Sequence, residues 1–271
     1  MSRIAACLKE LHRQGRKALI PYIVAGDPGP DFTVPMMHEL VKSGADLIEL
    51  GIAFSDPAAE GPVIQLAHER ALAFNTSLFD ALAMVETFRQ QNQKTPVILM
   101  GYANPVEKMG YEIFASQAVK SGVDGLLTVD MPPEEARALN AVLAKAQIDS
   151  IYLIAPTTTE QRMRAIAEVA TGYLYYVSLK GVTGAGHLDI DSVDEKLKQI
   201  RKITSLAVTV GFGIKDAQSA AAVAQLADGV VVGSALVDRV CKLSQLGGSQ
   251  SDVIVESSKL IGQMREAMDA L

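Results

Sequence analysis

Cysteine is scarce in this sequence of 271 residues, and its two cysteines, Cys7 and Cys241, show no CxxC or cysteine–histidine spacing. A disulfide framework or a structural zinc site needs several such residues at short, regular spacings. No set of histidine, cysteine and carboxylate residues has the spacing of metal ligands either. We therefore expect a protein of a reducing compartment that holds no metal ion.

The sequence also lacks an excess of positive charge. Its formal net charge is −6 at pH 7, which gives neither nucleic acid nor an anionic membrane a reason to bind. An anionic substrate would need a local phosphate-binding site in place of a favourable overall field.

Long apolar runs are missing as well. No run approaches the ~20 residues that span a bilayer, and the mixed-charge segment 1–17 lacks the apolar core and cleavage site of a signal peptide. Hydrophobic residues nevertheless make up 49% of the chain, enough for a sizeable core. We expect a soluble, cytoplasmic protein without a membrane partner.

What the sequence does contain is a repeated unit. Short apolar runs recur, each ends in a turn rich in Gly, Asp, Pro or Asn, and an amphipathic helical stretch follows. Several runs are apolar almost throughout, which is typical of strands covered on both faces of a parallel sheet. The eight runs are ALIPYIVAG (18–26), ADLIELGI (45–52), PVILMGY (96–102), GLLTVD (125–130), SIYLIAP (150–156), YLYYVS (173–178), LAVTVGFG (206–213) and GVVVGS (229–234).

Eight strand–helix units in a chain of this length predict a closed (β/α)8 TIM barrel, with residues 1–271 forming a single domain. An open doubly wound sheet is the alternative, but it usually has fewer strands and a GxGxxG motif, which is absent here. An N-terminal helix and a helix over 63–74 are additions to the plain pattern. Long loops are expected after the second and sixth strands, and segment 244–252 is expected to be a loop before the last helix.

One carboxylate stands inside an apolar strand. Glu49 lies between Ile48 and Leu50 in ADLIELGI, and a buried carboxylate is costly unless it is paired or protonated. Burial would raise its pKa and suit it to proton transfer near neutral pH. A structural glutamate, bonded to a backbone donor or a basic side chain, is the alternative interpretation.

Two further acids, Asp56 and Glu60, follow in the segment after this strand, FSDPAAEGPVIQ (54–65). Function in such barrels collects at the carboxyl ends of the strands, so folding of this loop could bring Glu60 and Glu49 to one mouth. Two acids in different environments can take separate proton-transfer roles. A solvated acidic loop, with Asp56-Pro57 as a turn, is the alternative.

Three glycine-rich turns follow strands six, seven and eight: KGVTGAG (180–186), GFGIKD (211–216) and GSALVD (233–238). Backbone N–H groups in such turns and at the start of the next helix bind anions, and barrels often bind phosphate beyond strands seven and eight. We expect a phosphate site at Gly213, Gly233 and Ser234, closed by Gly184. Glycine also ends strands for steric reasons alone.

The histidines indicate less. His12, His38 and His68 lie in helical stretches among charged residues, where surface or packing roles are expected, and His187 follows the sixth strand. No Ser–His–Asp order or nucleophile elbow is present.

Long segments of the chain resemble the tryptophan synthase alpha chains, in the order found in that family and over about residues 8–238. They are PYIVAGDP, DLIELGIAFSDPAAEGPVIQ, GVDGLLTVDMPPEEA, LIAPTTT, YYVSLKGVTGAG, VGFGI and ADGVVVGSALV. The resemblance implies a (β/α)8 barrel without a cofactor of its own, which works in an α2β2 heterotetramer with a β subunit that holds pyridoxal phosphate. It implies a lyase of tryptophan biosynthesis that cleaves indole-3-glycerol phosphate into indole and glyceraldehyde-3-phosphate by a retro-aldol reaction. The indole then passes to the β subunit.

By this resemblance, Glu49 is the general acid/base that protonates the indole carbon bearing the side chain, and Glu60 stands where the family usually has an aspartate that binds the indole N–H. The implied phosphate ligands are Gly184, Gly213, Gly233 and Ser234. The implied indole pocket comprises Tyr22, Met100, Leu127, Tyr175, Thr183 and Phe212. The implied surface for the β subunit comprises loop 53–60, with Asp56 and Pro57, together with Asn104 and Pro105.

The sequence departs from the family at the mouth of the site. Glu60 is one methylene longer than the expected aspartate, about 1.5 Å of extra reach. Ala53 stands where proline is common, and Tyr22 replaces a usual phenylalanine. These changes are compatible with a re-tuned pocket, or with weak activity and a retained allosteric role.

Two alternatives stay open. Another phosphate-binding barrel enzyme, such as an isomerase or indole-glycerol-phosphate synthase, is one; the synthase would need a lysine on an inner strand, and the first four apolar runs contain none. A barrel that mainly activates a β partner is the other. Release of indole by the isolated chain separates an enzyme from an activator.

Overall fold

Parallel strands close into a barrel in the computed structural model of this chain, which describes residues 2–178, 189–211 and 213–271. The strands are β1 (Ala18–Val24), β2 (Ile48–Gly51), β3 (Val97–Gly101), β4 (Gly125–Thr128), β5 (Asp149–Ile154), β6 (Tyr173–Val177), β7 (Ala207–Gly211) and β8 (Gly229–Val232). Each strand pairs with its neighbours in sequence, and β8 pairs with β1. The predicted (β/α)8 architecture is confirmed.

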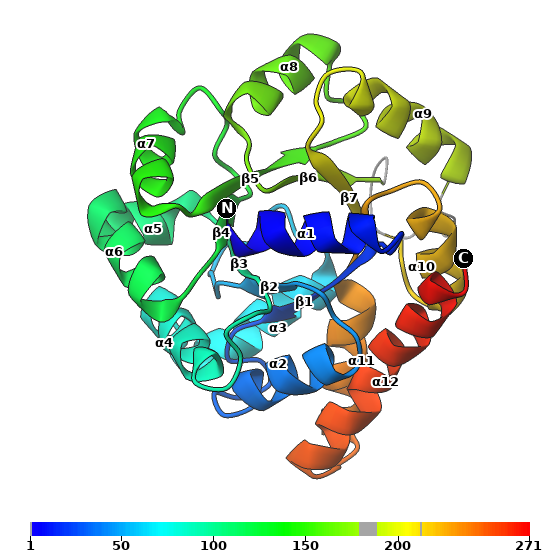
Figure 1. Cartoon of the computed structure of the whole chain (residues 1–271). Coiled ribbons are helices and arrows are strands. Elements are labelled where there is room, and N and C mark those ends of the chain that lie inside the picture. Colours follow the sequence, from blue (N-terminus) through cyan, green and yellow to red (C-terminus); the bar gives the residue numbers. More distant parts are fainter. Residues whose placement is uncertain (1, 179–188, 212) are drawn as a thin grey trace.

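Helices surround these strands, most of them in a ring and α1 across one end (Figure 1). Within the described ranges they are α1 (Arg3–Arg13), α2 (Thr33–Lys42), α3 (Pro62–Ala73), α4 (Leu78–Arg89), α5 (Ala103–Met109), α6 (Tyr111–Ser121), α7 (Arg137–Ala146), α8 (Glu160–Val169), α9 (Ile190–Arg201), α10 (Ala217–Ala224), α11 (Ser234–Gln245) and α12 (Gln250–Asp269). The N-terminal helix and the helix after β2 are present as predicted.

The loop expected over 244–252 is wrong in extent. Helix α11 continues to Gln245, and α12 already begins at Gln250. Ser249 caps α12, because its hydroxyl accepts a hydrogen bond from the Asp252 N–H at 3.2 Å. The polar residues thus start a helix instead of extending a loop.

Helix α1 lies across one end of the barrel (Figure 1). Its first residues contact the beginnings of strands: Ser2 bonds to Asp149 at the start of β5, and Arg3 pairs with Asp124 just before β4. Ile4 and Leu11 are buried and join the apolar cluster inside the barrel. The amino-terminal end of the barrel is therefore packed, which leaves the carboxyl end for a site.

The main core lies between the strands and the surrounding helices. Ile48 and Leu50 of β2 belong to this outer core, while Leu47, just before the strand, belongs to the cluster inside the barrel. A buried ion pair ties α4 to the start of β4, with Arg89 Nη2 at 2.6 Å from Asp124 Oδ2. That same carboxylate oxygen accepts the Val97 N–H at the start of β3. The buried Arg89–Asp124 pair thus holds the end of α4 and the starts of β3 and β4 together.

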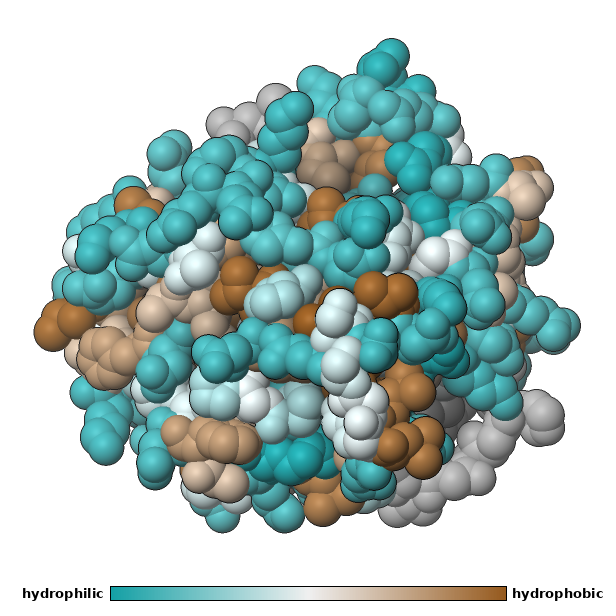
Figure 2. Space-filling model, turned by 90° about the horizontal axis from the view of Figure 1, so that it is seen from below, coloured by the Kyte–Doolittle hydropathy of each residue, from teal (hydrophilic) through white to brown (hydrophobic). Residues whose placement is uncertain are grey.

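The surface is mixed in character. Seen from the side of α2 and the start of α12, hydrophobic residues form small groups among hydrophilic ones (Figure 2). Exposed apolar side chains such as Phe79 and Leu246 lie on different elements. Within the described ranges, no helix has the length and apolar character needed to cross a membrane.

Candidate active site

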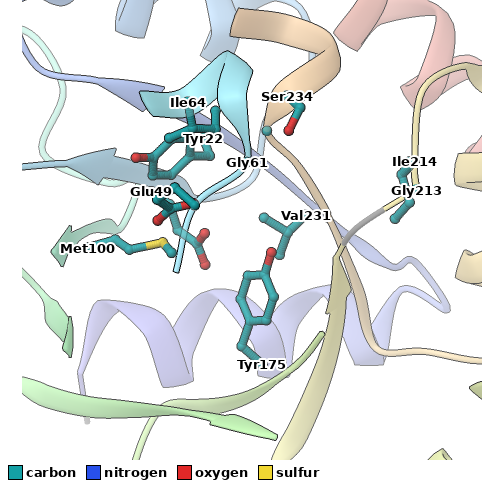
Figure 3. Close-up of a pocket in the computed structure, with 12 residues that line it drawn as sticks. Tyr22, Glu49, Gly61, Ile64, Met100, Tyr175, Gly213, Ile214, Val231 and Ser234 are labelled. Carbon is teal, nitrogen blue, oxygen red and sulfur yellow. The ribbon is translucent and has the colours of Figure 1, made fainter. Parts of the chain in front are cut away.

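A pocket opens at the carboxyl ends of the strands. It encloses about 560 Å³ of space outside protein atoms, open solvent at the mouth included. The lining residues come from five strands and from the segments that follow β2, β7 and β8: Tyr22, Glu49, Glu60, Gly61, Ile64, Met100, Tyr175, Gly213, Ile214, Val231, Gly233 and Ser234. Tyr22, Glu49 and Met100 lie on one side of this pocket, and Gly213 and Ser234 lie on the other (Figure 3).

Glu49 sits on the inner face of β2, paired in register with Tyr22 of β1. Its side chain is fully buried. The Tyr173 hydroxyl donates a hydrogen bond to Glu49 Oε1 at 2.5 Å. The other oxygen, Oε2, has no hydrogen-bond partner within the described ranges, so it remains able to exchange a proton with a bound molecule.

The burial of Glu49 changes its acidity. Loss of hydration raises the pKa of its carboxyl from 4.5 to about 7; the hydrogen bond from Tyr173 opposes that rise, and the nearby charge of Glu60 adds to it. A group with a pKa close to the ambient pH can both give and take a proton. The alternative interpretation of Glu49 was a structural acid bonded to a backbone donor or a basic side chain. Its partner is neither of these but the hydroxyl of Tyr173.

Glu60 reaches the same pocket from the loop between β2 and α3. A turn closes just before the helix, where the Glu60 N–H donates to the Pro57 carbonyl at 3.0 Å. Gly61 then caps α3 and Pro62 occupies its first turn, where a missing N–H costs nothing. Burial raises the pKa of the Glu60 carboxyl from 4.5 to about 7. The structure therefore brings Glu49 and Glu60 to one pocket. The β2–α3 loop is not a fully solvated acidic loop, because the Glu60 carboxyl is largely buried.

The far side of the pocket is built from glycine turns. Gly213 follows β7 with φ +77°, a conformation that favours glycine. Gly233 precedes α11, whose first residue is Ser234. The first N–H groups of a helix lack partners within it and carry partial positive charge. Gly213, Gly233 and Ser234 are thus together, as the sequence predicts, in surroundings suited to an anion.

Among the other predicted residues, Tyr22, Met100 and Tyr175 line the pocket. The ring of Tyr175 packs against Gly211, where a Cβ would lie only 2.0 Å from the tyrosine oxygen. Leu127 instead lies fully buried in the cluster inside the barrel and does not line the pocket. Thr183, Gly184 and Phe212 lie outside the described residues.

The residues expected to face a partner are at the surface beside the mouth. Asp56 is exposed and Pro57 is partly exposed in the β2–α3 loop. Asn104 is exposed and Pro105 partly exposed in the first turn of α5. Within the described ranges, no group of three or more metal-ligating side chains is suitably arranged for a metal ion.

The sequence did not predict the pocket-lining residues Gly61, Ile64, Ile214 and Val231, and it did not predict two polar residues that bond to the site, Tyr173 and His68. Tyr173, which donates a hydrogen bond to Glu49, lies in the apolar strand β6, where a tyrosine is an ordinary strand residue and gives no sign of a functional role. His68 was expected at the surface or in simple packing, but it is buried beside Tyr22 and the β2–α3 loop. The helical spacing of Ile64, His68 and Ala71, all buried, is the signal that would have placed His68 inside.

Comparison with known proteins agrees with this geometry. The family model described as "Tryptophan synthase alpha chain" matches residues 8–269. The tryptophan synthase alpha chain of Thioalkalivibrio sulfidiphilus is 57% identical over 269 residues, which cover 99% of this chain and 100% of that one. The alpha chain of Marinobacter nauticus is 54% identical over 271 residues, covering 100% and 99%.

Solved structures match over the whole barrel. Tryptophan synthase subunit alpha from Legionella pneumophila superposes with a TM-score of 0.92 at 47% identity, with 100% of both chains covered. A chain of tryptophan synthase from M. tuberculosis, in an aminoacrylate-bound form, superposes with a TM-score of 0.87 at 31% identity, with 99% and 100% covered.

This chain belongs to the tryptophan synthase alpha chain family. Members of this family are lyases of tryptophan biosynthesis that cleave indole-3-glycerol phosphate by a retro-aldol reaction, and they work with a β subunit. The chain therefore has the role of an alpha subunit, and the resemblance noted from its sequence motifs is confirmed.

The raised pKa of Glu49 predicts a pH-dependent stability. Because the folded-state pKa is about 7 and the ordinary value 4.5, the stability contributed by the protonated carboxyl is complete below about pH 4.5. It is lost as pH rises through 7. Between pH 5 and pH 8, the free energy of unfolding of the wild type should fall by up to about 3 kcal/mol relative to Glu49→Gln. Denaturant titrations of both proteins at the two pH values measure this, and parallel pH profiles would contradict it.

Proposed function

We propose that the pocket binds indole-3-glycerol phosphate with its indole ring beside Glu49 and Glu60 and its phosphate at Gly213, Gly233 and Ser234. The observation that carries this proposal is the polarity of one pocket: two carboxyls of raised pKa at one side and a helix start with glycine turns at the other (Figure 3). Indole-3-glycerol phosphate has the same two ends: an indole ring whose N–H can donate to a carboxylate, and a phosphate that suits the helix start.

The chemistry begins with the neutral carboxyl of Glu49. It transfers its proton to the indole carbon that bears the side chain, and the ring nitrogen becomes positively charged. The Glu60 carboxylate accepts a hydrogen bond from the ring N–H and stabilises this charge as it develops. Oε2 of Glu49, which has no partner within the described ranges, is the oxygen suited to the transfer.

The Glu49 carboxylate then removes the proton from the hydroxyl on the neighbouring side-chain carbon. The bond between that carbon and the ring breaks, its electron pair returns to the ring, and the nitrogen loses its charge. The side chain leaves as an aldehyde, glyceraldehyde-3-phosphate, and the ring leaves as indole. Glu49 ends protonated, as it began, so one residue serves as acid and base.

The departures from the family concern the indole end of the pocket. Glu60 is longer than the usual aspartate, and we propose that the β2–α3 loop compensates for the additional methylene. Ala53 supports this, since it lacks the fixed φ of proline. Tyr22, Met100 and Tyr175 would enclose the ring, with Leu127 below them in the barrel core. Thr183, Gly184 and Phe212 complete the site in this proposal.

The assembly follows from the family. We propose that residues 1–271 form a single domain, that the chain works in the cytoplasm in an α2β2 heterotetramer, and that pyridoxal phosphate belongs to the β subunit. Loop 53–60 and the start of α5, with Asp56, Pro57, Asn104 and Pro105, would contact that subunit. Their exposure beside the pocket mouth supports this.

Replacing Glu49 tests the reaction. Glu49→Gln should still bind substrate but lose indole release by roughly 10²–10⁴-fold in kcat, the usual contribution of a general acid/base. The wild-type rate should be greatest near pH 7, because one carboxyl must be protonated and the other ionised. Indole release by the purified chain measures both. A fall of less than tenfold would remove Glu49 from this role, and a wild-type chain without turnover would favour the activator alternative.

Placing a negative charge at Ser234 tests the phosphate site. Ser234→Asp should raise KM strongly, because a carboxylate repels phosphate at short range, whereas Ser234→Ala should raise it only modestly if backbone N–H groups supply most of the binding. Inorganic phosphate should inhibit the wild type competitively and the aspartate variant much less. Equal KM values for the three proteins would place the phosphate elsewhere.

Placing positive charge at the mouth tests the partner surface. Asp56→Lys and Asn104→Lys should each weaken association with a tryptophan synthase β chain, since a buried unmatched charge is costly. Glu195→Lys is the matched control, because Glu195 is exposed on α9, on the opposite side of the barrel from α5 (Figure 1). Size-exclusion chromatography of the mixtures measures association. If the control dissociates as readily as the other two variants, this surface is not the interface.

A further inference from the structure

A buried histidine joins the β2–α3 loop to the wall of the pocket. His68 lies on α3 and is 2% exposed. Its Nδ1 accepts a hydrogen bond from the Phe54 N–H at 3.1 Å, and its Nε2 lies 3.5 Å from the Tyr22 hydroxyl oxygen. Its two ring nitrogens thus contact a loop on one side and a pocket residue on the other.

These contacts fix the protonation of the ring. A backbone N–H can only donate, so Nδ1 must carry a lone pair, and the proton of a neutral imidazole resides on Nε2. Burial lowers the pKa of His68 to about 4, which keeps the ring neutral near pH 7. Nε2–H therefore points to the Tyr22 oxygen, and the contact at 3.5 Å is the longer and weaker of the two.

The loop is also held at its far end. The Ala59 N–H donates to the Tyr102 hydroxyl at 3.1 Å, and the rings of Phe54 and Tyr102 stack with centroids 4.9 Å apart. The backbone between Phe54 and Ala59 is thus fastened at both ends, and Glu60 follows directly. Because the Phe54 ring stacks on the same Tyr102 that holds Ala59, a shift of Phe54 would be passed through Tyr102 to the residue before Glu60.

We propose that His68 is a positioning residue for the cleavage reaction, which holds Phe54, and through the loop Glu60, at the distance from the indole ring that the reaction needs. This rests on the proposed function of Glu60. The phosphate end of the pocket lies across from this network, so His68 affects turnover and leaves substrate binding nearly unchanged. It acts through Glu60 and does not itself touch the substrate.

Substitutions at His68 separate its two contacts. In His68→Asn the amide oxygen lies as many bonds from Cα as Nδ1 does, so this variant keeps an acceptor for the Phe54 N–H. In His68→Gln the amide reaches the position of Nε2, so this variant keeps the Tyr22 contact and loses the loop contact. His68→Leu loses both. Tyr152→Phe is the matched control, since it removes a partly buried hydrogen bond from Asn140 at a residue outside the pocket lining.

We expect His68→Leu and His68→Gln to lower kcat by roughly tenfold, the upper range for one buried hydrogen bond, with little change in KM. His68→Asn should regain most of the wild-type kcat, and Tyr152→Phe should not differ from wild type. Thermal unfolding of each variant establishes that it is folded in the assay. If His68→Leu does not fold, the comparison of asparagine with glutamine still decides. Equal loss in those two variants overturns the proposal.

The decisive comparison is made in a Glu60→Gln background. If His68 acts through Glu60, adding His68→Leu to Glu60→Gln should lower kcat no further, because residues that act as a unit are not additive. The same tenfold loss in both backgrounds overturns the inference and leaves the role of Glu60 intact. Wild-type kcat in Glu60→Gln alone overturns the proposed function of Glu60, and the inference with it.

Discussion

The hydrogen bond between Tyr173 and Glu49, inside an apolar barrel, is the interaction on which the site depends. Without a donor, a carboxylate at this depth would be strongly disfavoured in its ionised form. With a cationic partner, its pKa would be held low and its proton lost. A neutral hydroxyl lies between these limits, and it satisfies one oxygen while leaving the other open. The remaining features of the pocket can be understood as surroundings that keep this balance.

Burial also raises the pKa of the second acid, Glu60, but a loop and not a strand provides that burial. Glu60 comes from a loop, not from a strand, so its burial depends on how that loop is fastened and not on the barrel itself. Both carboxyls have pKa values raised to about 7, and they influence each other, so their titrations belong to the pair. Loop geometry thus sets the burial and the acidity of Glu60, and it makes a smaller contribution to the acidity of Glu49 through the charge of Glu60.

Much of this could be predicted from the sequence, for identifiable reasons. Eight apolar runs of strand length, each followed by a helical stretch, predict the barrel, and a carboxylate within one of these runs marks Glu49 as a buried acid. Gly213 and Gly233 could be placed because glycine turns at strands seven and eight meet at one end of a barrel. The hydrogen-bond partners of Glu49 and His68 could not be predicted, because no local pattern encodes contacts between distant residues. Tyr173 is 124 residues from Glu49, and Tyr22 is 46 residues from His68. Segment 244–252 was misjudged because a polar serine and aspartate start a helix as readily as they form a loop.

The position of helix α1 affects how substrate enters the barrel and how products leave it. With Ile4 and Leu11 packed into its amino-terminal end, the described part of the barrel is filled at that end, and the pocket opens at the other. Substrate and products therefore pass the β2–α3 loop that carries Glu60, which lines this pocket. A partner placed over this end of the barrel would influence the entry of substrate and the release of product together.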